Sequence, residues 1–563
     1  MMTLRAQRLL RGLVLVTGPA VNIFITPFNS TDPINIPKLL LLSTLAFGAL
    51  GILIWNLKEI LVLGNKIFLV LIGLFVLDLF GIIVFSGAPL NQQVFGAFGR
   101  NTGLVAYLSL AVICLSASVV ATDSFLTKVS FGLLVTGMFT ALYAMLQTFG
   151  MDPVKWNNPH NAIVGFLGNP DFASSFLGIC GIVIFSIMLK RNQKIQVRFG
   201  ILIIFVLFGI LVFRSQAQQG LLVLGGGSAI VLLIYFITTE KLSKPRYLLP
   251  FSSSLIVGGM IVFFGTLKIG PLGDTLYKVS VRQRGFYWHA AVEMMKNHPL
   301  FGVGLDSYGD WYFNYRSINA ATLTPSVMSN ASHNVFLDFG ANGGYPLFGL
   351  HLALVILTSF SILKYLRRNR RFNWAYAGLV GAWVGYEAQA LISINQIGLA
   401  IWGWILMGIL IGVETTNRRE KSEHKLQKIN KPTQRLIKNK KAQEKSMIPI
   451  LFAGMVIGFL AILPSFTADM NYRTAQTSGS APRLINAATS NPRDSTRMTM
   501  AAQALANSNL LMEARKLILI NLKDNPRNYN AWQLELAMTK PGTIQHTEAL
   551  ARLRDLNPSE RIK

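Results

Sequence analysis

Long apolar segments recur along almost the whole chain and limit the folds that it can adopt. Of its 563 residues 52% are hydrophobic, and its mean hydropathy is +0.45. A helix crosses the hydrocarbon core of a bilayer with about 20 apolar residues, and by that measure the chain has about 13 candidate spans. Their centres lie near residues 19, 46, 75, 112, 138, 181, 205, 228, 259, 346, 383, 406 and 456. The sequence therefore predicts an all-α fold, a polytopic transmembrane bundle of about 12 or 13 spans.

The first of these segments is the weakest, because Pro19 and Asn22 interrupt it. It is not followed by the small-residue cleavage site of a secretory signal peptide. We therefore expect it to be retained as a span. If it were not inserted, the topology predicted below would invert.

Lys and Arg residues alternate between the loops in a way that predicts the orientation of the chain. The net charge is +27. The positive residues concentrate in the loops at 190–198, 240–246, 364–371 and 418–445, and the loops at 29–37, 86–101, 151–170, 216–219 and 393–396 are poor in them. Cytoplasmic loops carry such an excess. The N-terminus is therefore predicted to be cytoplasmic, and the chain after residue 466 extracytoplasmic.

The densest basic run, at residues 418–445, has two interpretations. In a soluble protein it would indicate nucleic acid, but beside a membrane span it favours an anchor to anionic lipid. We therefore expect the lipid bilayer as a partner and no nucleic acid.

The chain divides into four parts by composition. Residues 1–415 form the main bundle, in which residues 268–332 are a large extracytoplasmic loop. A basic cytoplasmic linker (416–446), one further transmembrane helix (447–465) and a soluble α-helical tail (466–563) follow.

In the tail, the pairs Asn491-Pro492, Asn525-Pro526 and Asn557-Pro558 recur at spacings of 34 and 32 residues. A period near 34 is typical of tetratricopeptide-type helix pairs, and an unrelated helical hairpin is the alternative. Such a tail would bind a protein partner or stack on the loop rather than catalyse.

Ionisable residues at the predicted outer face are the candidate functional residues. Residues 332–344 place His333 and Asn334 where the long polar loop enters an apolar helix, and Arg284 and Trp288 share a helix face at i, i+4 spacing. The other candidates at this face are Arg100, Arg214 and Arg282. Each has a structural alternative, since a His can cap a helix and an Arg can reach the interface or face water. A cationic loop that carries a His indicates chemistry on an anionic, lipid-linked substrate.

No metal or cofactor is expected. The chain has no Asp-x-Asp pair in this region and no Cys/His cluster of the kind that binds zinc. Cys114 and Cys180 lie inside apolar spans and are interpreted as small core residues.

At these residues the chain resembles the O-antigen ligase and polymerase superfamily. The resemblance covers most of residues 90–415. Its more specific motifs are Arg284, Trp288 and Ala291 with the stretch 299–304, and His333-Asn334 with Gly344; Gly99-Arg100 and 165–173 are weaker. Two departures are Leu347, where the family has a second glycine, and Ser215-Gln216 with Arg214 on the other side of the serine, where the family has Ser-Arg.

The resemblance implies a metal-independent glycosyltransferase of the bacterial cytoplasmic (inner) membrane. It would move a glycan from undecaprenyl diphosphate to an acceptor hydroxyl outside the membrane. His333 would then be catalytic together with Arg284, and Arg282, Arg100, Arg214, Asn334 and Trp288 would bind substrate. The acceptor stays open between glycan, lipid and protein, so a polysaccharide polymerase and a protein O-oligosaccharyltransferase are the enzymatic alternatives. A polysaccharide transporter or flippase would require paired inverted repeats, which the sequence lacks. An inert bundle with a scaffolding tail is the third class.

Overall fold

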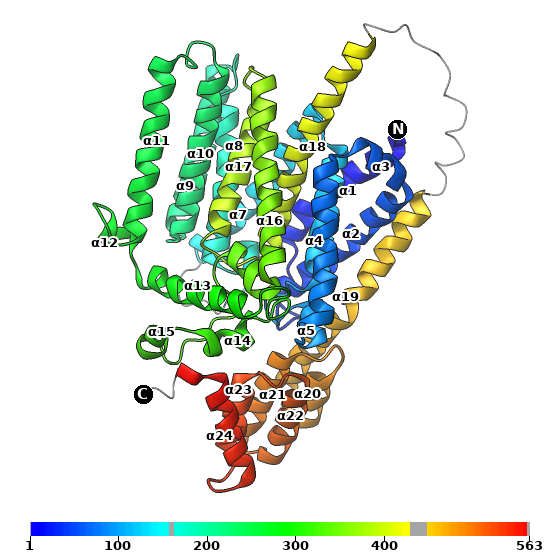
Figure 1. The fold of residues 1–563 in the computed structure, drawn as a ribbon, viewed down its shortest axis with the longest axis vertical. Coiled ribbons are helices and arrows are strands. Elements are labelled where there is room, and N and C mark those ends of the chain that lie inside the picture. Colours follow the sequence, from blue (N-terminus) through cyan, green and yellow to red (C-terminus); the bar gives the residue numbers. More distant parts are fainter. Residues whose placement is uncertain (1, 157–162, 428–446, 560–563) are drawn as a thin grey trace.

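The computed structural model describes residues 2–156, 163–427 and 447–559, and within these ranges it contains helices and no strand (Figure 1). The prediction of an all-α, multi-span membrane protein is confirmed. Every predicted span centre lies within a helix. These helices are α1 (Leu4–Ile23), α2 (Asn35–Trp55), α4 (Lys66–Phe85), α6 (Leu104–Val120), α7 (Asp123–Thr148), α8 (Pro170–Met188), α9 (Ile195–Arg214), α10 (Gln218–Thr238), α11 (Pro245–Thr266), α16 (Val335–Arg368), α17 (Trp374–Ala390), α18 (Ile397–Gln427) and α19 (Met447–Ser478).

Ten helices in the described part of the chain are long and apolar enough to cross a membrane. Helices α1, α6 and α17 fall short of that length or hydropathy. The weak first segment is nevertheless helical, with Pro19 inside it, and it packs against α2, α7 and α18.

Burial separates the central helices from the outer ones. The apolar part of α18 is entirely buried and includes Trp402 and Trp404, both 1% exposed. At the other extreme, Gly265 is the one buried residue of α11. An apolar helix that is buried all round belongs at the centre of a bundle, whereas an apolar helix exposed all round suits contact with lipid.

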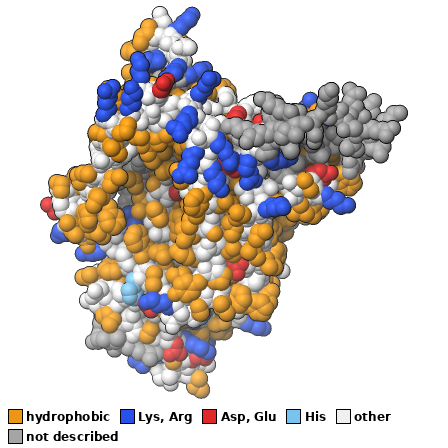
Figure 2. All heavy atoms as spheres, turned by 45° about the horizontal axis from the view of Figure 1, so that its top comes forward, with side chains coloured by type: hydrophobic (Ala, Val, Ile, Leu, Met, Phe, Trp, Pro, Cys, Tyr) orange, Lys and Arg blue, Asp and Glu red, His pale blue; other side chains and the backbone are white. Residues whose placement is uncertain are grey.

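The two ends of the bundle differ. The N-terminus and the end of α18 lie at one end, whereas the α11–α16 connection and the tail lie at the other (Figure 1). Lys and Arg side chains gather near the first end, and hydrophobic side chains cover much of the surface beyond them (Figure 2). The predicted basic linker 416–446 begins inside α18, and its residues 428–446 lie outside the described residues.

Short helices fill the loop predicted at residues 268–332. They are α12 (Gly273–Leu276), α13 (Val279–Asn297), α14 (Tyr308–Tyr315) and α15 (Ile318–Leu323). The remaining short elements of the bundle are α3 (Leu57–Leu63), α5 (Leu90–Phe95) and the 3-10 turn η1 (Gly165–Leu167).

The tail is helical and has its own hydrophobic core. Helix α19 runs past residue 465 to Ser478 and leads into α20 (Ala481–Thr489), α21 (Ser495–Asn507), α22 (Leu511–Asp524), α23 (Tyr529–Met538) and α24 (Ile544–Leu556). Asn525 and Asn557 end α22 and α24, as the Asn-Pro spacing predicted. The tetratricopeptide-like repeat itself stays a prediction.

The tail docks on α14. The Arg527 guanidinium lies 3.3 Å from the centroid of the Trp311 ring, and Asn525 donates a hydrogen bond to Asp310 at 3.2 Å. The rings of Phe313 and Tyr529 are 4.4 Å apart. The loop at residues 268–332, which contains α14, is therefore held between the bundle and the tail.

Two glycine-rich segments near residues 299–304 and 340–345 pack backbone to backbone. Val303 and Gly304 donate hydrogen bonds to the carbonyls of Ala341 and Asn342, at 2.9 and 3.1 Å, and Tyr345 donates to Pro299 at 2.8 Å. Gly344 has φ +71°, which interrupts the helical conformation of α16, and a Cβ there would overlap the backbone at Pro299 and Leu300. Glycine permits both features.

We expect Gly344→Ala to destabilise the purified protein, because it combines a disfavoured φ with a backbone overlap and costs about 1–3 kcal/mol or more. The measurement is the thermal midpoint in detergent. Gly349→Ala is the matched control, since Gly349 lies on the same helix with open space at its Cβ position. Equal midpoints for the two variants would contradict this account of the kink.

Candidate functional site

A cavity of ≈ 860 Å³ opens among α10, α11 and α13 and contains the predicted cationic residues of the loop. Its lining includes Arg282, Arg284 and Trp288, together with Lys278 and Asp171. The cationic groups of the lining outnumber its one carboxylate, and much of the rest is apolar. The cavity therefore suits an anion that carries an apolar portion.

Arg284 is the cation with the clearest unused capacity. Its Nε atom is buried, as is the Nε1 atom of Trp288, and neither has a hydrogen-bond partner among the described residues. Burial lowers the pKa of Arg284, while the nearby carboxylate of Asp171 opposes that shift. Asp171 in turn accepts a hydrogen bond from Gln219 at 3.1 Å. A buried donor without a partner costs free energy, so an acceptor supplied by a ligand would stabilise this arrangement.

His333 is not among the residues that line the cavity, but it is close enough to Arg284 for the two side chains to interact electrostatically. Its ring stacks on Tyr287 of α13, with centroids 5.2 Å apart. Burial lowers the pKa of His333 to about 4, and the guanidinium groups of Arg284 and Arg100 contribute to this shift. The imidazole is therefore neutral at pH 7 and can accept a proton.

The backbone around His333 is fixed by its neighbours. His333 has φ +55°, and Ser332 donates its N–H to Asp338 at 2.7 Å. Asn334 is the N-cap of α16, and its side-chain oxygen accepts a hydrogen bond from Leu337 at 3.1 Å. With its side-chain oxygen committed to this cap, Asn334 serves to position His333 in this arrangement.

Arg100 is a buried anchor, only 4% exposed. Its guanidinium pairs with Asp306 at 3.1 Å and Asp338 at 3.5 Å, and it donates a hydrogen bond to the Asn330 carbonyl at 2.6 Å. Removing one partner of such a buried pair costs about 3–5 kcal/mol. A loss of activity on Arg100→Ala would therefore report folding as much as substrate binding.

The other two predicted arginines are exposed and lie at the cavities. Arg282 lines the 860 Å³ cavity. Arg214 lines an adjacent cavity of ≈ 550 Å³, which shares Gln216, Ala217 and Gln218 with the first. The structure thus brings Arg284, Arg282 and Trp288 to one cavity and Arg214 to the neighbouring cavity. His333 and Arg100 line neither cavity, but His333 is close enough to Arg284 and Arg100 for both to lower its pKa.

Several contributing residues were not identified from the sequence. Asp171, Gln219 and Tyr287 come close to Arg284 or His333 only through tertiary packing. Asp338 lies within the stretch 332–344 that the sequence analysis singled out. Nothing in the sequence, however, indicates that it pairs with Arg100.

Within the described residues, no group of three or more His, Cys, Asp or Glu side chains could hold a metal ion. The chemistry that the site offers comes from its own side chains: a neutral imidazole, guanidinium groups and an aromatic wall.

Comparison with known families identifies a domain in this part of the chain. Residues 203–352 match the family model described as O-Antigen ligase, so the chain carries an O-antigen ligase family domain. The match includes Arg214, Arg282, Arg284, Trp288 and His333 but not Arg100. No curated protein matches the chain.

We expect the acid limb of kcat/KM to lie near pH 4, because a group whose pKa is lowered to about 4 stays neutral until the pH falls through that value. Arg284→Gln removes a cation that lowers this pKa. The limb measured on the residual activity should therefore move to higher pH. Arg282→Gln is the control, because an exposed charge is screened; it should lower the rate without moving the limb. An unmoved limb in the Arg284 variant would contradict the electrostatic coupling.

Proposed function

We propose that this membrane protein is a glycosyltransferase of the ligase type. It transfers a glycan from undecaprenyl diphosphate to an acceptor hydroxyl on the outer side of the bacterial cytoplasmic membrane. The O-antigen ligase family domain supports the reaction class. The observation that carries the proposal is the buried, unpartnered Nε of Arg284, on a cavity next to a neutral His333.

The donor would lie in the cavity with its diphosphate at the cationic wall. Arg284 and Arg282 can bind diphosphate oxygens in bidentate fashion and stay charged at any physiological pH. Trp288 shares the cavity with them and offers an indole N–H and an apolar face. The apolar remainder of the lining suits the first part of the polyprenyl chain.

In the transfer step, His333 accepts the proton of the acceptor hydroxyl. The acceptor oxygen forms a bond to the anomeric carbon of the glycan, and the bond from that carbon to the diphosphate oxygen breaks. The diphosphate leaves with the bonding electron pair, and the guanidinium groups stabilise its growing charge. Every proton and charge is accounted for by the chain's own residues, so the step uses no metal and no cofactor.

Donor binding would also change the pKa of His333, the proposed base. A bound diphosphate places negative charge near His333, which favours the protonated imidazole and raises its pKa from about 4 toward neutral pH. His333 would thus be a weak base in the free protein and a stronger one once the donor is bound.

The alternatives differ in acceptor or in class. A polymerase would use a second lipid-linked glycan as acceptor, and a protein O-oligosaccharyltransferase would use a Ser or Thr hydroxyl. A transporter would place its polar binding residues near the middle of the membrane. The cations of the cavity, Lys278, Arg282 and Arg284, instead lie at the start of α13. This helix lies at one end of the bundle (Figure 1), which favours the enzyme.

We expect His333→Ala to lower transfer from an undecaprenyl-diphosphate-linked glycan by about 100- to 10,000-fold, the usual contribution of a general base. Arg284→Ala should cost about 100-fold or more. Transfer is measured with purified protein, with and without chelator. His546→Ala, in the tail, is the control. Full activity of the His333 and Arg284 variants would contradict the catalytic roles proposed for these residues. A wild-type protein that is inactive with every acceptor would favour the transporter or the scaffold.

We expect the tail to face outward and the α8–α9 loop inward. Cys114 and Cys180 are buried, so single cysteines introduced at exposed positions can be labelled selectively. A membrane-impermeant maleimide should label Gln503→Cys in intact spheroplasts, but Asn192→Cys only after lysis. The reverse pattern would mean that the predicted topology, with a cytoplasmic N-terminus, is inverted.

A further inference from the structure

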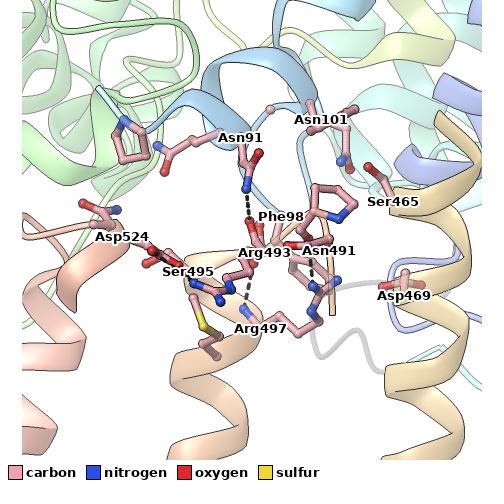
Figure 3. Close-up of a pocket in the computed structure, with 18 of the residues that line it drawn as sticks. Asn91, Phe98, Asn101, Ser465, Asp469, Asn491, Arg493, Ser495, Arg497 and Asp524 are labelled. Atoms are coloured by element: carbon pink, nitrogen blue, oxygen red, sulfur yellow. Dashed lines mark hydrogen bonds and ion pairs between the residues drawn. The ribbon is translucent and has the colours of Figure 1, made fainter. Parts of the chain in front are cut away.

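A cavity of ≈ 290 Å³ lies where the tail meets the bundle (Figure 3). It shares no lining residue with the cavity at Arg284. We call it the interface cavity. Its lining comes from the start of α2 and the residues before it, from α5 with its flanking residues, from α19 and from the tail. The lining residues are Asp32, Ile36, Pro89, Leu90, Asn91, Gln92, Phe95, Gly96, Phe98, Asn101, Ser465, Asp469, Asn491, Pro492, Arg493, Asp494, Ser495, Arg497, Met498, Asp524 and Asn525. No site residue predicted from the sequence is among them.

Two buried polar groups on this lining lack partners. Asn101 is 7% exposed and Ser465 is 8% exposed. The Oδ1 atom of Asn101 and the Oγ atom of Ser465 have no hydrogen-bond partner among the described residues. Asn101 has φ +55°, a left-handed conformation that Asn adopts more readily than most other residues. Both groups can satisfy a ligand, since the amide oxygen accepts and the hydroxyl both donates and accepts.

The charged side chains of the interface cavity are already engaged within the protein. Arg493 pairs with Asp524 at 3.2 Å. Arg497 donates hydrogen bonds to the carbonyls of Ser490 and Pro492, at 2.7 and 2.9 Å. The carboxylate of Asp469 accepts the backbone N–H of Thr31 at 2.8 Å. The cations are thus occupied, and acidic residues outnumber them on the lining, so the cavity is poorly suited to a phosphate or another anion.

The neutral part of the lining points to a sugar. Side-chain amides and hydroxyls alternate there with apolar groups such as Phe98 and Met498. A sugar ring needs this combination, because its hydroxyls both donate and accept while its C–H faces are apolar. The volume lies at the lower end of the range of about 300–1,000 Å³ for ligand sites, so it suits one ring rather than a long chain.

We propose that the interface cavity is a second saccharide site, which holds a neutral sugar of the acceptor while the diphosphate of the donor occupies the cavity at Arg284. The assignment to the acceptor rests on the proposed function; the saccharide site itself does not.

One segment connects the two sites. Phe98 and Asn101 line the interface cavity, and Arg100, between them, enters the ion pairs with Asp306 and Asp338 beside His333. On the same wall, Gln92 donates hydrogen bonds to the carbonyl of Asp306 and to the carboxylate of Asp310, at 3.0 and 2.9 Å. A ring held in the cavity would therefore contact the segment that fixes the geometry around His333.

The first test is a photocross-link that needs no activity assay. p-Benzoylphenylalanine replaces Asn91, at the exposed rim of the interface cavity, in the full-length protein in its native membrane. Irradiation and mass spectrometry of the resulting peptides should find hexose or related saccharide masses on the peptide that carries position 91. The same substitution at Gln503, exposed on α21 and outside the cavity, is the matched control. Adducts of peptide or phospholipid at position 91, or a saccharide yield no higher than at position 503, would overturn the proposal.

The second test assigns the sugar to the acceptor. Ser465→Leu fills the cavity, and Asn101→Asp keeps a residue type that tolerates positive φ while it replaces the neutral amide with a charge. With acceptor glycan released from the host envelope by mild acid as the probe, each variant should raise the KM for acceptor about fivefold to tenfold. The KM for the lipid-linked donor should stay within twofold. Thr467→Leu on α19 and Asn486→Asp on α20, both exposed and outside the cavity, are the controls.

The outcomes separate the two proposals. An unchanged KM for acceptor in both cavity variants would overturn the acceptor assignment. A saccharide cross-link at position 91 in a protein that transfers no glycan would contradict the proposed function and uphold the saccharide site.

Discussion

The arrangement of the long loop against the bundle depends on one buried guanidinium, that of Arg100. Arg100 comes from the segment after α5, Asp306 from the long loop and Asp338 from the first turn of α16, and the ion pairs join all three. Charges so deeply buried are stable only when they are paired, because desolvation of an isolated ion is costly. The pairing therefore constrains the loop and α16 to one relative position. His333, five residues before Asp338, and the turn at 299–304 are held in place by the same constraint.

The bilayer explains why the functional residues lie where they do. A helix in lipid satisfies its own backbone, so irregular structure and ionisable side chains concentrate at the ends of the spans. In this protein the irregular segments at the end of the bundle away from the N-terminus pack on one another. The turn at 299–304 packs on Ala341–Gly344, and the tail packs on α14. The loop is thus covered on both sides. Burial of His333, together with the guanidinium groups of Arg284 and Arg100, lowers its pKa to about 4.

Much of the fold could be predicted from the sequence, because the length of an apolar segment is a local signal. All the span centres coincide with helices, and even the segment interrupted by Pro19 forms α1. The i, i+4 relation placed Arg284 and Trp288 on one cavity, as expected for a helix. Contacts between segments that are distant in the sequence give no such local signal. The stacking of Tyr287 on His333, the approach of Asp171 to Arg284 and the docking of Arg527 on Trp311 depend on tertiary packing. For the same reason Arg100 looked like a candidate ligand for the substrate, although two carboxylates already pair with it.

The two cavities differ in a way that fits a reaction between two unlike substrates. At Arg284 the lining is cationic and a buried donor lacks a partner, whereas in the interface cavity the cations are engaged and neutral polar groups lack partners. A site for a leaving diphosphate needs fixed positive charge, but an excess of charge at an acceptor site would attract the donor's diphosphate to the wrong place. If the two cavities hold donor and acceptor as proposed, donor binding would depend on the bundle and acceptor choice on the tail. A change in the tail could then alter the acceptor without any change at His333.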